Sequence, residues 1–166
     1  MTESYKELLV KKERGVKENI LRGISVVPTV LIILLTLLMP NFLFFIVAIG
    51  FGVLTYFIFQ WTDIEYEYLY LDKEITVDKI MAKTRRKRVL TISVDKIEIL
   101  APVNSYQLDS YRNRQVKATD YSAGGDLPEE KQYAMYYDGN EKYLLNLTED
   151  FAKTIKGIAP RKVFLD

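Results

Sequence analysis

Hydrophobic positions are distributed unevenly along the chain, and the longest apolar segment covers residues 23–62. No residue in this segment is charged; Arg22 is the last charged residue before it and Asp63 is the first one after it. A helix needs about 20 apolar residues to cross a bilayer, so the segment suits two short spans better than one. Near its middle stand Pro40 and Asn41, which are turn-forming residues. The pattern therefore predicts a helical hairpin.

We expect this transmembrane hairpin to occupy residues 23–61, with one span at about 23–39 and the other at about 42–60. The segment does not fit a secretory signal peptide, because its charged leader is long, the apolar stretch is about twice the usual length and no small-residue cleavage pattern follows. The alternative is a hairpin buried inside a soluble protein, but soluble core helices rarely lack charge over such a length.

Basic residues stand on both sides of the apolar segment, whereas the turn at Pro40 and Asn41 has none. Those on the two sides are Lys6, Lys11, Lys12, Arg14, Lys17 and Arg22, then Lys73, Lys79, Lys83, Arg85, Arg86, Lys87 and Arg88. Basic flanks favour the cytoplasmic side of a membrane. We therefore expect a multi-pass protein of the cell membrane with both termini in the cytoplasm and only the central turn outside.

Residues 1–22 are expected to be cytoplasmic, and residues 4–22 are expected to be helical. Ser4 and Glu7 have the spacing of a capping box. Apolar residues recur after them at intervals of three and four, with basic residues between them. Two interpretations stay open for this segment: an amphipathic helix that lies in the headgroup region, or a solvated leader that is continuous with the first span.

The second span contains two features that are typical of membrane helices. Ala48 and Gly52 are small residues four positions apart, a spacing that allows a close approach of two helices. The first span is the expected partner, and a homo-oligomer is the alternative. Tyr56 and Trp61 lie near the cytoplasmic end of the span, where aromatic side chains form an interfacial belt.

After Thr62 the hydrophobic period changes to two, which is typical of β-strands. Strands are predicted over residues 64–71, 75–82, 88–94, 97–101, 114–121, 132–137 and 143–147, with a basic turn over 83–87 and no firm assignment for 103–113. Asp138-Gly139 between the last two strands is a hairpin signal. The last element is predicted to be a helix over 149–158, because apolar residues repeat on one face and Thr148 can cap it.

Three segments carry a resemblance to a known family: YEYLYLDKEITVDKI, TISVDKIEIL and YLLNLTEDFAKTIKGI. Together with the hairpin before them, they resemble the uncharacterised bacterial two-span membrane proteins that carry a PH-like (pleckstrin-homology-like) domain, here over residues 62–166. The resemblance implies an α+β fold in which seven antiparallel strands form a bent, nearly closed barrel or sandwich capped by the C-terminal helix. It implies membrane-associated scaffolding or regulation and no catalytic residues.

Lipid-binding eukaryotic members of that fold hold phosphoinositides largely through a basic loop between the first two strands. The corresponding turn here is Asp72-Lys73-Glu74, which is short and mostly acidic, so inositol-phosphate binding is not expected. The basic stretch follows one hairpin later, at Lys83, Arg85, Arg86, Lys87 and Arg88. A strand of about eight residues is roughly 27 Å long, which would return this turn to the membrane. We expect it either to clamp the domain onto anionic lipid headgroups or to be a solvated turn.

The composition narrows the function further. The chain has no cysteine and no histidine, which excludes disulfides, Cys/His zinc sites, thiol nucleophiles and histidine acid–base chemistry. A net charge of +1 gives no global field for nucleic acid. We expect no enzyme, cofactor or metal, and a non-catalytic membrane protein whose cytoplasmic PH-like domain binds a protein or a lipid surface. The alternative is a small regulatory or accessory subunit of a membrane transport or export complex, assembled through the hairpin.

Overall fold

The computed structural model describes residues 5–165, and the chain divides into two compact units. The first, which we call the helical unit, consists of Glu13–Ile64 and Met81–Arg85. The second, the β unit, consists of the chain up to Lys12, Glu65–Ile80 and the chain from Arg86 onward. Each unit is therefore assembled from segments that are separate in sequence, because the chain passes between the two units more than once.

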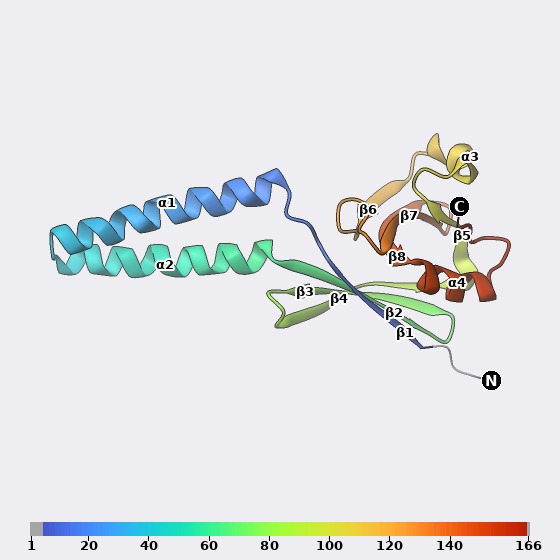
Figure 1. Cartoon of the computed structure of the whole chain (residues 1–166), viewed down its shortest axis with the longest axis horizontal. Coiled ribbons are helices and arrows are strands. Elements are labelled where there is room, and N and C mark those ends of the chain that lie inside the picture. The colour runs from blue at the N-terminus through green and yellow to red at the C-terminus, as the bar shows by residue number, and fades with distance from the viewer. Residues whose placement is uncertain (1–4, 166) are drawn as a thin grey trace. The chain divides into compact units, whose positions relative to one another are not determined.

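Two antiparallel helices form most of the helical unit: α1 (Val16–Leu38) and α2 (Phe42–Thr62) (Figure 1). Both are long and apolar enough to cross a membrane by length and composition, and their apolar side chains are largely exposed. The turn lies where Pro40 and Asn41 predicted it, and the Asn41 side chain accepts a hydrogen bond of 2.9 Å from the backbone N–H of Leu43. Helix α1 begins before the predicted span, so its polar first turns are continuous with the apolar segment.

The two helices are joined by hydroxyl groups. The hydroxyls of Thr29 and Thr55 lie 2.8 Å apart, and that of Thr55 also donates to the Ser25 carbonyl at 3.1 Å. Polar contacts of this kind hold helices together in an apolar solvent, where burial of hydrophobic surface gives no driving force. Gly52 is half-buried on α2, yet a Cβ placed there would meet no atom within 4 Å.

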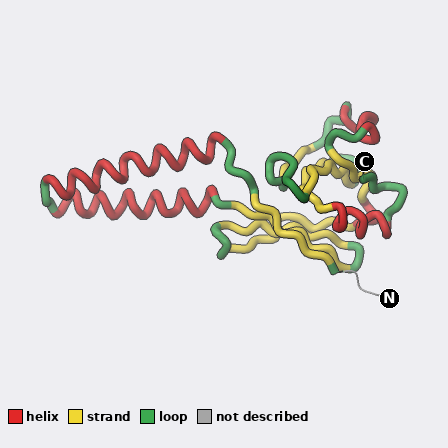
Figure 2. Tube along the Cα trace, viewed as in Figure 1, coloured by secondary structure: helices red, strands yellow, loops and turns green. Residues whose placement is uncertain are grey.

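The N-terminal segment differs from the expectation. Lys6–Lys11 forms a strand, β1, that pairs antiparallel with β2 (Ile64–Leu71), so the predicted helix over this part of the chain is wrong (Figure 2). Ser4, the proposed cap, lies outside the described residues. Val10 is only 1 % exposed in the core, and its strand partner Tyr66 lies 56 positions further on. A partner so distant overrides the weak local helical pattern.

The β unit contains two four-stranded sheets. The first has the order β1-β2-β3-β4, with β3 at Glu74–Met81 and β4 at Arg85–Ser93. The second has the order β5-β7-β8-β6, formed by Ile97–Pro102 (β5), Glu130–Tyr137 (β7), Glu141–Thr148 (β8) and Lys117–Asp120 (β6). The fold is α+β as expected, but the sheets do not form a closed seven-stranded barrel. β1 adds a strand, β6 runs parallel to β8, and β4 is not paired with β5.

The short helical elements lie in the second half of the chain. A 3-10 turn at Val94–Lys96 connects the sheets, and the segment left unassigned from sequence contains a 3-10 turn at Tyr106–Leu108 followed by α3 at Asp109–Arg112. The last helix, α4 (Glu149–Ile158), has the predicted bounds, and the Thr148 hydroxyl accepts a hydrogen bond from the N–H of Phe151 at 3.2 Å. Local signals were sufficient for this helix.

Tyrosine side chains fill the space between the two sheets. The hydroxyl of Tyr68, on β2, donates to the carbonyl of Tyr121 at 2.6 Å and accepts from the backbone N–H of Asn146, on β8, at 3.3 Å. The fully buried Asn146 side chain in turn accepts from Ala123 N–H at 2.8 Å and donates to the carbonyl of Gly125 at 2.7 Å. This buried network connects the two sheets and holds the loop after β6.

Two tight turns illustrate how hairpin geometry is achieved. Asp138 and Gly139, between β7 and β8, both have positive φ, as the sequence predicted. Ala82 and Lys83, between β3 and β4, also have positive φ, of 49° and 57°. The predicted basic turn over 83–87 is therefore too long: the turn closes at Thr84, whose N–H donates to the Met81 carbonyl at 3.2 Å, and β4 begins directly afterwards.

Candidate membrane-interface site

A pocket of about 320 Å³ lies within the helical unit. Its lining comes from three places: the start of α1 with the residues just before it, the end of α2, and the turn between β3 and β4. We call it the arginine pocket; its lining residues are Arg14, Arg22, Tyr56, Phe59, Gln60, Asp63, Ala82 and Lys83. Three of these side chains are basic and one is acidic. The pocket is therefore positively charged and lies at one end of the uncharged helical hairpin.

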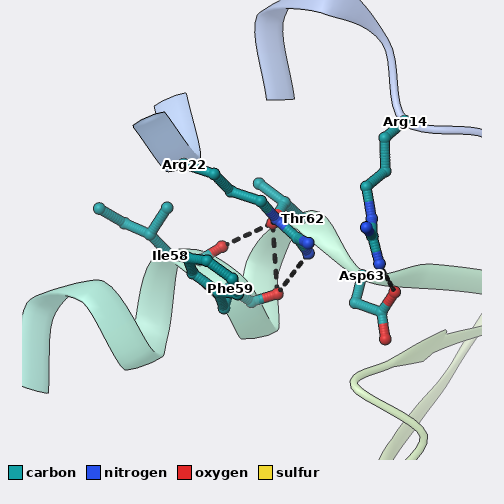
Figure 3. A network of polar contacts seen from close by, with 6 residues as sticks. All are labelled: Arg14, Arg22, Ile58, Phe59, Thr62 and Asp63. Carbon is teal, nitrogen blue, oxygen red and sulfur yellow. Dashed lines mark hydrogen bonds and ion pairs between the residues drawn. The ribbon is translucent and has the colours of Figure 1, made fainter. Parts of the chain in front are cut away.

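Arg22 makes more contacts than either of the other two basic side chains of this pocket (Figure 3). Its Nε donates to the Thr62 hydroxyl at 2.6 Å, and its Nη2 donates to the Phe59 carbonyl at 3.1 Å. Its guanidinium lies 4.5 Å from the centre of the Phe59 ring. A cation at the C-terminal end of a helix satisfies free carbonyl groups and is favoured by the helix dipole. Arg22 thus connects the start of α1 to the end of α2.

The opposite wall of the pocket is fixed by Asp63. Its carboxylate accepts a hydrogen bond from Arg14 at 3.2 Å (Figure 3), and its carbonyl accepts one from the N–H of Ala82 at 2.9 Å. The second of these bonds places the turn between β3 and β4 beside the end of α2. Lys83, the next residue of that turn, is exposed and has no hydrogen bond or ion pair with another described residue.

The basic residues predicted to contact lipid do not form one uniform group. Arg86 contacts the Glu67 carboxylate at 2.5 Å, and Arg88 contacts that of Asp78 at 3.2 Å. Both carboxylates are buried, so these two arginines compensate charges within the first sheet. Lys83, Arg85 and Lys87 remain as exposed cations with no ion pair to a described residue.

Glu67 stands in a strained electrostatic environment. Burial raises the pKa of its carboxyl above the usual value, while the adjacent Arg86 guanidinium lowers it. Its Oε2 has no hydrogen-bond partner among the described residues. This carboxylate therefore depends on one partly exposed arginine, which makes the pair important for the stability of the first sheet, and the lipid contact of Arg86 stays a prediction.

The other predicted residues lie on α2. Ala48 and Gly52 are half-buried, and their role in helix packing stays a prediction, because the polar contacts between the helices are made by other residues, among them Thr29 and Thr55. Tyr56 and Trp61 are 60 % and 64 % exposed, and Tyr56 also lines the arginine pocket. Their role in an interfacial belt likewise stays a prediction.

Sequence reasoning did not identify Arg14, Arg22 and Asp63 as members of a site. A signal was nevertheless present, because Arg22 and Asp63 are the charged residues that delimit the apolar segment. When two spans form a hairpin, the ends of the segment are brought together, and so are the charges at those ends. The turn that contributes Lys83 could not be placed in this way, since it follows two strands.

The architecture defines a β domain with two sheets and a C-terminal helix, interrupted after its first strand by a long apolar hairpin. A family model described as Bacterial PH-like domain (DUF6106) matches residues 2–165. The chain therefore belongs to this family of bacterial PH-like proteins. The match extends over nearly the whole chain, so it includes β1 and the hairpin as well as residues 62–166. No curated protein and no solved structure matches the chain.

Proposed function

We propose that this chain is a non-catalytic integral membrane protein whose hairpin, α1 and α2, anchors a PH-like domain at the cytoplasmic face of the cell membrane. The domain there binds a protein partner or a lipid surface. One observation carries the proposal: a hairpin of exposed apolar helices is inserted between two strands, β1 and β2, that pair with each other. An insertion of this kind is suited to a lipid solvent, where exposed apolar side chains carry no penalty.

The pairing of β1 with β2 supports a two-span topology. Lys11, the last residue of β1, is opposite Glu65 on β2, and the whole hairpin lies between these two residues in sequence. Paired strands occupy the same compartment, so both flanks of the hairpin belong on one side of the membrane. The basic residues of both flanks favour the cytoplasmic side.

The exposed cations support contact with a lipid surface. Arg85 and Lys87 follow the turn that contains Lys83, and this turn lies beside the end of α2. Each basic side chain near an anionic leaflet contributes about 1 kcal/mol to binding. Because Arg86 and Arg88 are paired with buried carboxylates, the proposed clamp depends mainly on the three free cations.

A cysteine-accessibility experiment tests the topology directly, since the natural chain contains no cysteine. Pro40→Cys places a thiol in the turn between the spans, and Asn113→Cys places one at an exposed position of the β unit. A membrane-impermeant maleimide applied to intact cells is expected to label the first variant only, and both after lysis. Labelling of Asn113→Cys in intact cells, or recovery of the protein in the soluble fraction after carbonate washing, would refute the proposal.

A further inference from the structure

The arginine pocket contains more positive charge than its own residues neutralise. Asp63 is its single acidic lining residue, and its carboxylate is engaged by Arg14. Neither Arg22 nor Lys83 forms an ion pair with a described residue, although Asp63 also attracts the Arg22 guanidinium, so two cations without an ion pair face a pocket of about 320 Å³. An anion from outside the chain would stabilise cations in such a setting.

The geometry of Arg22 favours a phosphate group. Its contacts to Thr62 and Phe59 use two of the five guanidinium N–H groups, and Nη1 has no partner among the described residues. The side chain is held in place by these bonds and by the aromatic ring beneath it. A guanidinium oriented in advance can bind two oxygens of one phosphate, and it loses little conformational freedom when it does so.

The position along the chain indicates where this phosphate comes from. Arg22 directly precedes the uncharged segment, and Asp63 directly follows it. In a protein with two membrane spans these residues lie at the level of the lipid headgroups, where aromatic side chains such as Tyr56 are also favoured. The pocket wall combines the Phe59 ring with the polar side chain of Gln60, which suits a molecule that is polar at one end and apolar at the other.

We propose that the arginine pocket binds the phosphodiester of an anionic phospholipid, with Arg22 and Lys83 as its principal ligands. This inference rests on the proposed membrane insertion of α1 and α2, and it deepens the proposed function by assigning a defined headgroup site in addition to a diffuse clamp. The site differs from the clamp because the guanidinium of Arg22 is fixed within the helical unit. Binding there connects α1, α2 and the turn between β3 and β4 through one ligand.

Trp61 is the single tryptophan of the chain and lies on α2 one residue beyond Gln60, so it reports on the lipid near the pocket. The full-length protein is reconstituted in vesicles of phosphatidylcholine mixed with phosphatidylglycerol. In one preparation the phosphatidylcholine is brominated and in the other the phosphatidylglycerol, and the two degrees of tryptophan quenching are compared. Two cations that each favour an anionic surface roughly fivefold predict a clear preference for phosphatidylglycerol. We expect the natural protein to prefer it at least about fivefold, and Arg22→Gln/Lys83→Gln to fall severalfold, to the weaker preference that the clamp cations Arg85 and Lys87 supply.

A matched control removes the same charge outside the pocket. Arg85→Gln/Lys87→Gln eliminates two exposed cations of the clamp and is expected to lower the preference measured at Trp61 less than the pocket variant does, whereas an equal loss in both double variants would overturn the pocket in favour of diffuse charge. Should Arg22→Gln not fold, Lys83→Gln alone removes an exposed side chain and is expected to lower the preference roughly two- to fivefold. An unchanged preference in a folded Lys83→Gln variant would contradict its role as a ligand.

Two further outcomes separate the sources of error. If no brominated lipid quenches Trp61, the hairpin is not in the bilayer and the proposed function itself fails. If both lipids quench it equally, membrane insertion stands and the headgroup site fails. Inorganic phosphate in excess, at constant ionic strength, is expected to leave the preference for phosphatidylglycerol unchanged. If inorganic phosphate abolishes this preference, the pocket binds a soluble phosphate and not a lipid.

Discussion

The hydroxyl of Tyr68 is the most informative single group to remove, because it connects the two sheets at a buried point. Tyr68→Phe deletes a hydrogen bond of 2.6 Å to the Tyr121 carbonyl and one of 3.3 Å from the N–H of Asn146. The Tyr68 side chain is fully buried, so neither former partner gains access to water. Leaving a buried polar group without a partner costs about 1–3 kcal/mol, and the longer bond counts for less.

We therefore expect Tyr68→Phe to lower the free energy of unfolding of the β unit by about 2–3 kcal/mol. For a domain of about a hundred residues, one kcal/mol changes Tm by roughly 4 °C, so the expected decrease is roughly 8–12 °C. Thermal unfolding of the full chain in detergent, followed by near-ultraviolet circular dichroism, measures this change because that signal depends on the packing of tyrosine rings.

Tyr66→Phe is the matched control for this experiment. Tyr66 lies on the same strand and the same face, its ring contacts that of Tyr121 edge-on at 5.7 Å, and its hydroxyl makes no hydrogen bond to a described residue. Its loss of stability is expected to stay below about 1 kcal/mol. If the two variants unfold at the same temperature, the hydroxyl of Tyr68 does not connect the sheets as argued.

Three other predictions concern the same unit. Val10→Asp places a charge at a position that is 1 % exposed and is expected to detach β1, which limited proteolysis would detect as cleavage near the N-terminus of an otherwise resistant chain. Arg86→Ala leaves the buried carboxylate of Glu67 without its cation and is expected to cost roughly 1–2 kcal/mol in urea unfolding, a modest value because the arginine is more than half exposed; adding Glu67→Gln should recover most of it. Burial raises the pKa of Glu130, so the stability that this carboxyl contributes is present below its unfolded pKa of about 4.3 and is lost as the pH rises through the folded pKa. Glu130→Gln is therefore expected to raise Tm at pH 7 and to leave it unchanged near pH 4, and an equal effect at both pH values would contradict this reasoning.

Several elements could be predicted because their determinants are local. The apolar segment and its turn at Pro40 and Asn41 predicted α1 and α2 closely at their shared end. The cap at Thr148 and the apolar repeat behind it predicted α4 with its bounds. Asp138-Gly139 predicted the hairpin of β7 and β8, since few residues accept positive φ at both central positions of a tight turn.

The candidate site was only partly accessible from the sequence. The basic stretch was found because its charges are adjacent in sequence. That Arg86 forms an ion pair while Lys87 forms none with a described residue depends on which carboxylates face β4 across the sheet. Arg22 was overlooked as a member of the pocket because its partners, Phe59 and Thr62, lie about 40 positions away. Local periodicity carries no information about such a contact.

By itself, the sequence determined the apolar character of the hairpin, the alternation of the β half and the C-terminal helix, because each depends on neighbours within one or two turns of chain. Tertiary structure alone decided that the N-terminal segment is a strand, that β6 runs parallel to β8, and that the arginine pocket exists. In each case the stabilising partner is distant in sequence, and the free energy of that pairing outweighs the weak preference of the local residues.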